Sequence, residues 1–158
     1  MKRSTCIYLI RDGRWLMMLR NRKKNDVNHD KWIGVGGKCE KEESFEACAV
    51  REVKEETGLT VLKLDYAGLL LFEYEGKQPE EIAVYTSESF EGELRDCDEG
   101  TLAWIPEEDI LNLALWEGDR IFLEQMLAGN REPFRIRLVY DRNDKLIHSE
   151  SYAEGEVQ

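Results

Sequence analysis

The sequence predicts an α/β protein in which helices flank a mixed β-sheet. Its 158 residues suffice for one domain with a buried core, and 42% hydrophobic with 35% charged residues is an ordinary globular composition. Most of the chain reads as short strands between turn signals, while two segments carry apolar residues at helical spacing. Many strands with two clear helices favour a sheet covered by helices. We expect residues 1–158 to form a single domain, with a disordered tail at about 153–158.

The first half of the chain begins with a predicted hairpin. Apolar runs at 5–10 and 15–20 flank Asp12-Gly13, a dipeptide that favours a tight hairpin turn. The polar and turn-rich segment 21–31 is expected to be a loop. Residues 32–38 contain three glycines and predict a short strand that enters a tight turn.

The clearest predicted helix spans residues 43–57. Ser44 or Glu43 could cap its start, and Gly58 suits the left-handed position just after its end. The second half of the chain then predicts three strands, a helix and a closing hairpin across Arg142-Asn143-Asp144. Their expected bounds are 59–72, 82–90 and 102–105 for the strands, 113–127 for the helix, and 134–140 with 145–151 for the hairpin.

Charge and cysteine content narrow the class of partner. A net charge of -11 argues against a large nucleic-acid interface, but an acidic protein can bind a small phosphorylated molecule through divalent metal ions. No apolar run reaches the roughly 20 residues of a membrane span, and no signal peptide is evident, so we expect a cytoplasmic protein without a membrane partner. The four cysteines lack metal-site spacing and are most simply reduced thiols.

Three glutamates share one side of the helix at 43–57. At about 100° per residue, Glu52, Glu55 and Glu56 occupy an arc of roughly 100°, beside a separate apolar stripe. Unneutralised, such carboxylates destabilise the helix and raise one another's pKa. A Mg²⁺ ion would relieve both effects, because it takes carboxylate oxygens and keeps positions for water and phosphates. For the helix alone, a solvated acidic face is the simpler reading.

The flanking residues change that balance. From Gly37 the chain reads five residues, Glu43, seven residues, and then Arg51-Glu52-Val53-Lys54-Glu55-Glu56-Thr57-Gly58-Leu59. This pattern matches the full Nudix box, G-x5-E-x7-R-E-U-x-E-E-x-G-U, where U is a bulky apolar residue. The chain therefore resembles the Nudix hydrolases.

The resemblance implies an α/β/α sandwich fold and hydrolysis of a nucleoside diphosphate linked to another group. It also implies that Glu52, Glu55 and Glu56 bind Mg²⁺, that the Gly37 carbonyl contributes, and that Mn²⁺ can substitute. Glu43 lies nearly opposite these glutamates on the helical wheel, so we expect it to pair with Arg51 and brace the segment. Gly58 is expected to have a structural role.

Beyond the box, the segments 31–38, 98–104 and 115–119 resemble the MutT-type 8-oxo-dGTP diphosphatases. By this resemblance Glu99 is a further metal-binding or catalytic carboxylate. The expected substrate-binding residues are Trp116 and Asp119 at the purine, Phe72 and Tyr74 in the pocket wall, and Arg20 and Lys38 at the phosphates. The aromatic residues could instead be core packing, Lys38 could be merely solvated, and Arg20 could pair with a nearby acid.

One position departs from the subfamily. Animal members carry an Asn where this chain has Ile33, and Ile33 has no hydrogen-bonding side chain. Either backbone groups and Asp119 read the base, or the preference for an oxidised guanine is weaker or different.

The expected reaction is hydrolysis of an oxidised purine dNTP such as 8-oxo-dGTP to the monophosphate and pyrophosphate. Glu56 or Glu99 is the preferred general base for a metal-bound water. Two alternatives stay open: another substrate of the same chemistry, such as ADP-ribose or a dinucleoside polyphosphate, and a nucleotide-binding module that has lost catalysis. The protein is expected to act as a monomer or homodimer.

Overall fold

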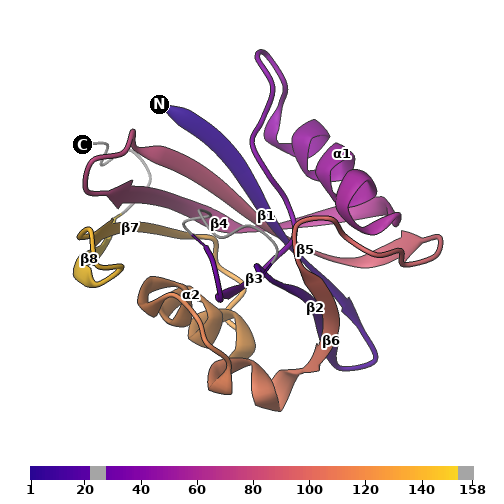
Figure 1. Ribbon diagram of the computed structural model, residues 1–158. Helices are drawn as coiled ribbons and strands as arrows, with labels where there is room; N and C mark the ends of the chain where they lie inside the picture. The colour runs from indigo at the N-terminus through magenta and orange to yellow at the C-terminus, as the bar shows by residue number, and fades with distance from the viewer. Residues whose placement is uncertain (22–27, 153–158) are drawn as a thin grey trace.

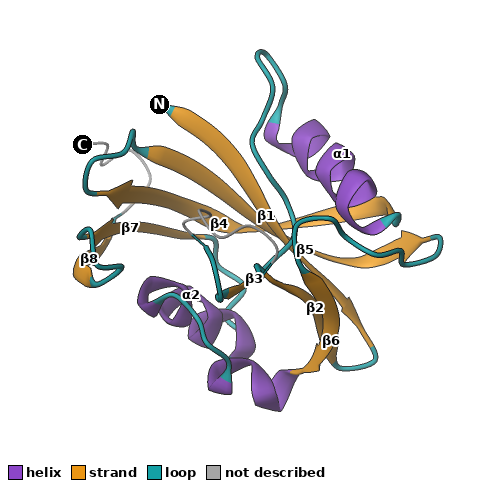
Figure 2. Cartoon of the chain, viewed as in Figure 1, coloured by secondary structure: helices purple, strands orange, loops and turns teal. Residues whose placement is uncertain are grey.

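The computed structural model describes residues 1–21 and 28–152, and it places helices on both faces of one mixed sheet (Figure 1). The sheet has eight strands in the order β3-β2-β1-β5-β4-β7-β8, with β6 paired to β2. The strands are β1 Lys2–Arg11, β2 Arg14–Leu19, β3 Trp32–Ile33, β4 Thr60–Tyr74, β5 Glu80–Glu91, β6 Thr101–Pro106, β7 Phe134–Tyr140 and β8 Leu146–Ser151. The helices are α1 Phe45–Thr57, the 3-10 helix η1 Glu107–Asn112 and α2 Glu117–Leu127 (Figure 2).

Strand β1 separates two hydrophobic cores. Its side chains alternate, as strand geometry requires, so that Ile7 and Leu9 pack in the cluster that holds Val53 of α1. Tyr8 points to the other face and packs in the cluster that holds Phe122 of α2. The predicted α/β/α sandwich with a mixed sheet is confirmed, since β1 pairs parallel with β5 and antiparallel with β2.

Both predicted hairpins are present. Asp12 and Gly13 have φ angles of 53° and 71°, the left-handed conformation that a tight hairpin turn between β1 and β2 needs. The second hairpin joins β7 to β8, and Asp144 in its turn also has a positive φ of 62°.

The predicted strand at 32–38 is too long. Only Trp32–Ile33 pairs as a strand, because Gly36 takes a φ of 146° that breaks regular pairing. The rest of the segment still runs beside β1, since Thr5 N–H donates to the Gly37 carbonyl at 2.9 Å. This contact holds the glycine turn against the centre of the sheet.

Both predicted helices begin later in the structure. Helix α1 starts at Phe45, because Ser44 Oγ accepts the Ala47 N–H at 3.1 Å and so caps the first turn. The predicted helix at 113–127 starts only at Glu117, since Leu113 and Trp116 have extended backbone angles. Helix η1 was not predicted. Its segment lacks a long helical period.

Two expectations fall outside the described residues: the tail at 153–158, and part of the loop at 21–31, namely 22–27. Among the described helices, none combines the length and the apolar character needed to cross a membrane.

Candidate active site

Helix α1 carries the predicted glutamates and is fixed at both ends. Ser44 caps its start, and Gly58 ends it with a φ of 83° while its N–H donates to the Lys54 carbonyl. A side chain at Gly58 would also meet the Glu93 carbonyl at 2.8 Å. The sequence prediction of a left-handed glycine after the helix is confirmed.

The glycine turn lies directly against the glutamates. Gly36 N–H donates to Glu56 Oε1 at 2.7 Å. At Gly37 an added Cβ would come within 2.6 Å of the Glu52 carboxylate, so a side chain there would displace that carboxylate from its present position. The structure therefore brings Gly37, Glu52 and Glu56 together, as the Nudix box implies.

Glu56 is the most buried of these carboxyl groups. Burial, followed by the neighbouring carboxyl of Glu99, raises the pKa of Glu56 to about 9. Its Oε2 atom is buried and has no hydrogen-bond partner among residues 1–21 and 28–152. The pKa of Glu52 is also raised, first by burial. Two carboxyl groups with raised pKa values and a buried oxygen without a partner fit a divalent cation, because its charge would favour the ionised form of both groups.

Glu99 reaches the same place from the loop between β5 and β6. Arg20 Nη1 lies 3.5 Å from Glu99 Oε2, so the predicted phosphate-binding arginine pairs with a predicted metal-binding glutamate. The alternative reading of Arg20 as the partner of a nearby acid therefore describes this structure. Arg20 also lines the cavity described below, where a phosphate could compete for it.

Arg51 joins the box residues in one ion-pair network. Its guanidinium donates to both oxygens of Glu43, each at 2.8 Å, and this contact holds the pKa of Glu43 down to about 2. The same side chain contacts Glu52 at 2.9 Å and Glu55 at 3.2 Å. The structure places Glu43 on Arg51 as expected. Arg51 also neutralises two of the glutamates, and its contact with Glu55 is an i,i+4 pair of the helix.

Glu55 differs from its two neighbours. Its side chain is 59% exposed, against 16% for Glu52, and it points along the solvent side of α1 toward Arg51. Helical spacing alone treats the three glutamates as equivalent, whereas the structure separates one solvent-facing carboxylate from two inner ones.

A cavity of about 270 Å³ begins at the glycine turn and extends toward α2. Phe72 and Trp116 form part of its wall, with an edge-to-face contact and ring centroids 5.9 Å apart. Of the expected substrate-binding residues, the cavity brings together five: Arg20, Lys38, Phe72, Trp116 and Asp119.

Tyr74 is the expected pocket residue that does not line this cavity. Its ring contacts Phe72 and Trp116 from behind, and its hydroxyl donates to Asp144 Oδ1 at 2.5 Å. Tyr74 therefore supports the aromatic wall from the end of β4, where the β7–β8 turn holds its hydroxyl.

Asp119 supplies the cavity with a carboxyl group whose pKa is raised. It lies in the first turn of α2, and burial raises its pKa to about 7. A carboxyl with this pKa donates a hydrogen bond when protonated and accepts one when ionised.

Sequence reasoning missed several residues of the cavity. Asn28 Oδ1 accepts the Trp116 indole N–H at 2.7 Å and fixes that ring, while Lys31 lies 4.8 Å from the ring centre. Cys6 and Ile82 complete the apolar wall. Strand alternation in β1 could have indicated Cys6, which is two residues from Tyr8, but no sequence signal marked Asn28.

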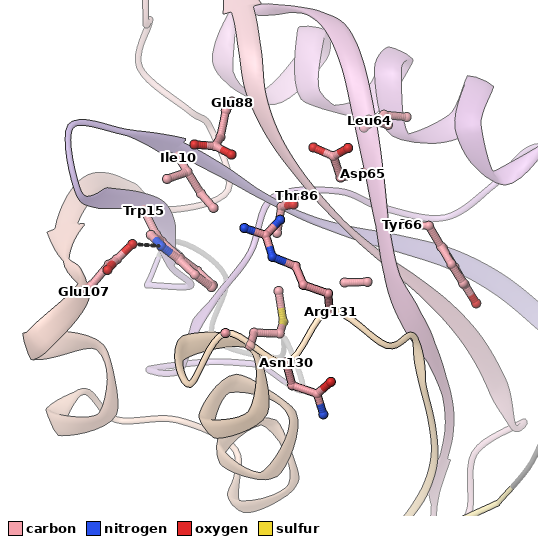
Figure 3. Close-up of a pocket in the computed structure, with 13 residues that line it drawn as sticks. Ile10, Trp15, Leu64, Asp65, Tyr66, Thr86, Glu88, Glu107, Asn130 and Arg131 are labelled. Atoms are coloured by element: carbon pink, nitrogen blue, oxygen red, sulfur yellow. Dashed lines mark hydrogen bonds between the residues drawn. The ribbon is translucent and has the colours of Figure 1, made fainter.

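A second cavity, of about 480 Å³, lies between the end of α2 and strands β4 and β5 (Figure 3). It contains none of the expected site residues. Arg131 reaches into it, but Asp65, Glu88 and Glu107 surround the opening. Three carboxylates against one cation disfavour a polyphosphate there, so the smaller cavity, which begins at the glycine turn beside the glutamates, is the candidate active site.

Comparisons with known proteins agree with this geometry. The family model described as NUDIX domain matches residues 1–126. The chain is 31% identical over 131 residues to the oxidized purine nucleoside triphosphate hydrolase of Danio rerio, covering 82% of each chain. It is 30% identical to the protein of the same name from Mus musculus, covering 72% of this chain and 74% of the mouse protein.

Solved structures share the fold. The MutT protein from Bacillus halodurans superposes with a TM-score of 0.84 at 24% identity, covering 96% of this chain and 97% of that one. The MutT protein from Methanosarcina mazei superposes with a TM-score of 0.72 at 27% identity, covering 83% and 96%.

Proposed function

The chain belongs to the Nudix family, and from this premise we propose that it hydrolyses oxidised purine nucleoside triphosphates to the monophosphate and pyrophosphate in a Mg²⁺-dependent reaction. The observation that carries the proposal is that Glu52 and Glu56 lie against the glycine turn, which lines one end of a cavity with an aromatic wall. Two relatives whose names give that activity support the substrate class.

Mg²⁺ suits the glutamates that lie beside the glycine turn of the cavity. Glu52, Glu56 and Glu99 would hold it, with Glu55 at the solvent side. The Gly37 carbonyl, which accepts the Thr5 N–H and the Cys48 thiol, is the further expected ligand. A Mg²⁺ ion held by these residues would supply positive charge for the phosphates and a water of lowered pKa. Oxygen ligands only, with room for water and phosphate, are the set that Mg²⁺ prefers.

The residues of the chain perform the remaining steps. The ring of Trp116, fixed by Asn28, stacks on the purine, and Asp119 hydrogen-bonds to its edge. Lys38 and Arg20 bind the phosphates and stabilise charge that develops on the transferred group. Glu56 or Glu99 accepts the proton of the water. Arg51 and Glu43 hold the glycine turn and helix in register, because Arg51 also donates to the Lys38 carbonyl at 3.2 Å.

Hydrolysis assays with Mg²⁺ test the proposal. The panel compares 8-oxo-dGTP, dGTP, ADP-ribose and a dinucleoside polyphosphate, and ¹⁸O-water locates the phosphorus that is attacked. We expect the highest kcat/KM for the oxidised purine triphosphate. A higher kcat/KM for ADP-ribose or the dinucleoside polyphosphate would show that the proposed substrate class is wrong. Nucleotide binding without hydrolysis of any compound would favour a non-catalytic module.

A further inference from the structure

A second group of potential ligands lies beside the glutamate cluster but shares no residue with its expected metal ligands. The side-chain donor atoms of Cys39, Glu43 and Cys48 all lie within 4.8 Å of one another. Two thiols and a carboxylate form a softer ligand set than the all-oxygen group of Glu52, Glu56 and Glu99.

The backbone fixes all three residues. Cys39 N–H donates to the Arg3 carbonyl at 2.8 Å, which ties the segment after the glycine turn to β1. Cys48 lies in the first turn of α1, and its N–H donates to the Ser44 carbonyl at 2.9 Å. Glu43 precedes the helix cap and accepts the Glu40 N–H at 2.9 Å. The donor atoms therefore converge without a large rearrangement.

The spacing suits a tetrahedral ion. Zinc lies about 2.3 Å from thiolate sulfur and roughly 2.0–2.2 Å from carboxylate oxygen, so its ligands sit about 4 Å or less from one another. Small side-chain rotations close the distances found here. Thr5 Oγ1, at 3.6 Å from Cys48 Sγ, or a water can take the fourth position, and half-buried Cys39 provides access from solvent.

The ion would offset most of the charge of its ligands. Two thiolates and one carboxylate carry three negative charges, against two positive charges on the ion. Arg51, which contacts Glu43 as well as Glu52 and Glu55, offsets part of the remainder.

We propose that Cys39, Glu43 and Cys48 form a binding site for a thiophilic divalent cation such as Zn²⁺, separate from the Mg²⁺ site. Burial raises the pKa of the Cys48 thiol to about 12, so an ion must displace a firmly held proton. Zn²⁺ and Cd²⁺ do so readily because they bind thiolate strongly, whereas Mg²⁺ does not. The site therefore selects against the ion that the glutamates prefer.

Occupancy should inhibit the enzyme, a consequence that rests on the proposed function. Glu43 would be shared between the ion and Arg51, and the Cys48 thiol would give up its contact with the Gly37 carbonyl at 3.5 Å. Both changes disturb the glycine turn against which Glu52 and Glu56 are placed.

The test is a Cd²⁺ titration of the reduced protein in excess Mg²⁺, followed by ultraviolet sulfur-to-cadmium charge-transfer absorption. We expect saturation at one equivalent in wild-type protein, and at least about tenfold weaker binding in both Cys39→Ser and Cys48→Ser. Cys97→Ser, which removes a buried thiol outside the group, and Glu56→Gln should both keep the wild-type absorption.

The proposal would be wrong if the wild-type protein showed no charge-transfer absorption, or if both serine variants titrated like the wild-type protein. A second measurement tests inhibition: Zn²⁺ is titrated into the hydrolysis assay at saturating Mg²⁺, and Cys39→Ser should need at least about tenfold more Zn²⁺ for half-inhibition. If the chain proves inactive on every nucleotide, the Cd²⁺ titration still decides the binding site on its own.

Discussion

The glutamate end of the site is the glycine turn that lines the cavity, together with the carboxylates packed against that turn. There Glu52, Glu55 and Glu56 come from one helix, and Gly37 lies only fifteen positions before the first of them. At the aromatic end, Phe72, Trp116 and Asp119 come from β4 and from the start of α2, with Cys6 added from β1. The first end depends on local spacing, whereas the second depends on how distant elements pack.

The two ends therefore differ in how far their residues can be substituted. At the glutamate end, a side chain at Gly37 would displace the Glu52 carboxylate, and one at Gly36 would meet the Thr5 carbonyl at 2.2 Å, so few substitutions preserve the arrangement. At the aromatic end, Ile33 lines the cavity without a hydrogen-bonding side chain, at the position where the sequence departs from the resembled subfamily. We expect changes at the glutamate end to act on kcat and changes at the aromatic end to act on KM.

The largest effect is expected for Glu56→Gln. This change keeps the size of the side chain and its contact with Gly36 but removes the inner carboxylate, so kcat should fall by at least about 100-fold. Steady-state kinetics with saturating Mg²⁺ measures the loss. Glu46→Gln, on the exposed side of the same helix, should keep near wild-type turnover.

Glu55→Gln sharpens this result. Glu55 is exposed and paired with Arg51, so its replacement should reduce kcat less than that of Glu56. Equal and small losses in both variants would contradict the assignment of the glutamates as the catalytic group.

The same contrast explains what could be predicted from the sequence. The hairpin at Asp12-Gly13, the helix ended by Gly58 and the convergence of Gly37, Glu52 and Glu56 follow from interactions between near neighbours. Asn28 could not be predicted, because its contact with Trp116 joins residues 88 positions apart. The predicted start of α2 is wrong because Leu113 and Leu115 pack against the core although the backbone at Leu113 is extended.

Replacing Trp116 by Leu tests the aromatic end. Stacking of a base on an aromatic ring contributes about 1–3 kcal/mol, so KM for the oxidised purine triphosphate should rise about tenfold while kcat changes little. Trp15→Leu is the matched control, because Trp15 is also buried and its indole N–H also donates to a side-chain oxygen, that of Glu107. Both variants should lose similar stability. A KM that rises equally in both would place the base elsewhere.

Arg95→Ala should weaken Mg²⁺ binding by the glutamates, although Arg95 lies outside α1. Arg95 donates to the carbonyls of Lys54 and Glu55, and its own N–H donates to the Thr57 carbonyl at 2.9 Å. These contacts fasten the loop that carries Glu99 to the end of α1. We expect roughly fivefold lower activity at limiting Mg²⁺.

The Mg²⁺ dependence distinguishes positioning from general stability. Raising the Mg²⁺ concentration should restore the activity of Arg95→Ala. Arg95→Lys should keep part of the activity even at the limiting Mg²⁺ concentration. A lower melting temperature with an unchanged Mg²⁺ requirement would show that Arg95 only stabilises the fold.

The smallest effect is expected at Asp119, where the pH dependence carries the information. Its pKa is raised by burial from 3.8 to about 7, so the folded protein keeps a proton that the unfolded chain loses near pH 4. Because the folded state binds more protons in this window, the free energy of unfolding should fall as pH rises from about 4 to 7. Urea unfolding of Asp119→Asn should show a shallower fall, because the raised pKa values of Glu52 and Glu56 still contribute to it.

The same substitution tests how the base is recognised. Below pH 7 the Asp119 carboxyl donates a hydrogen bond, and above it the carboxylate only accepts, so KM for the oxidised purine triphosphate should change with a midpoint near pH 7. In Asp119→Asn, KM should be flat with pH and differ from wild type by roughly threefold, the value of one neutral hydrogen bond. Identical pH profiles of KM in the two proteins would mean that Asp119 does not contact the base, and would leave recognition at this end of the cavity to stacking on Trp116 and to backbone groups.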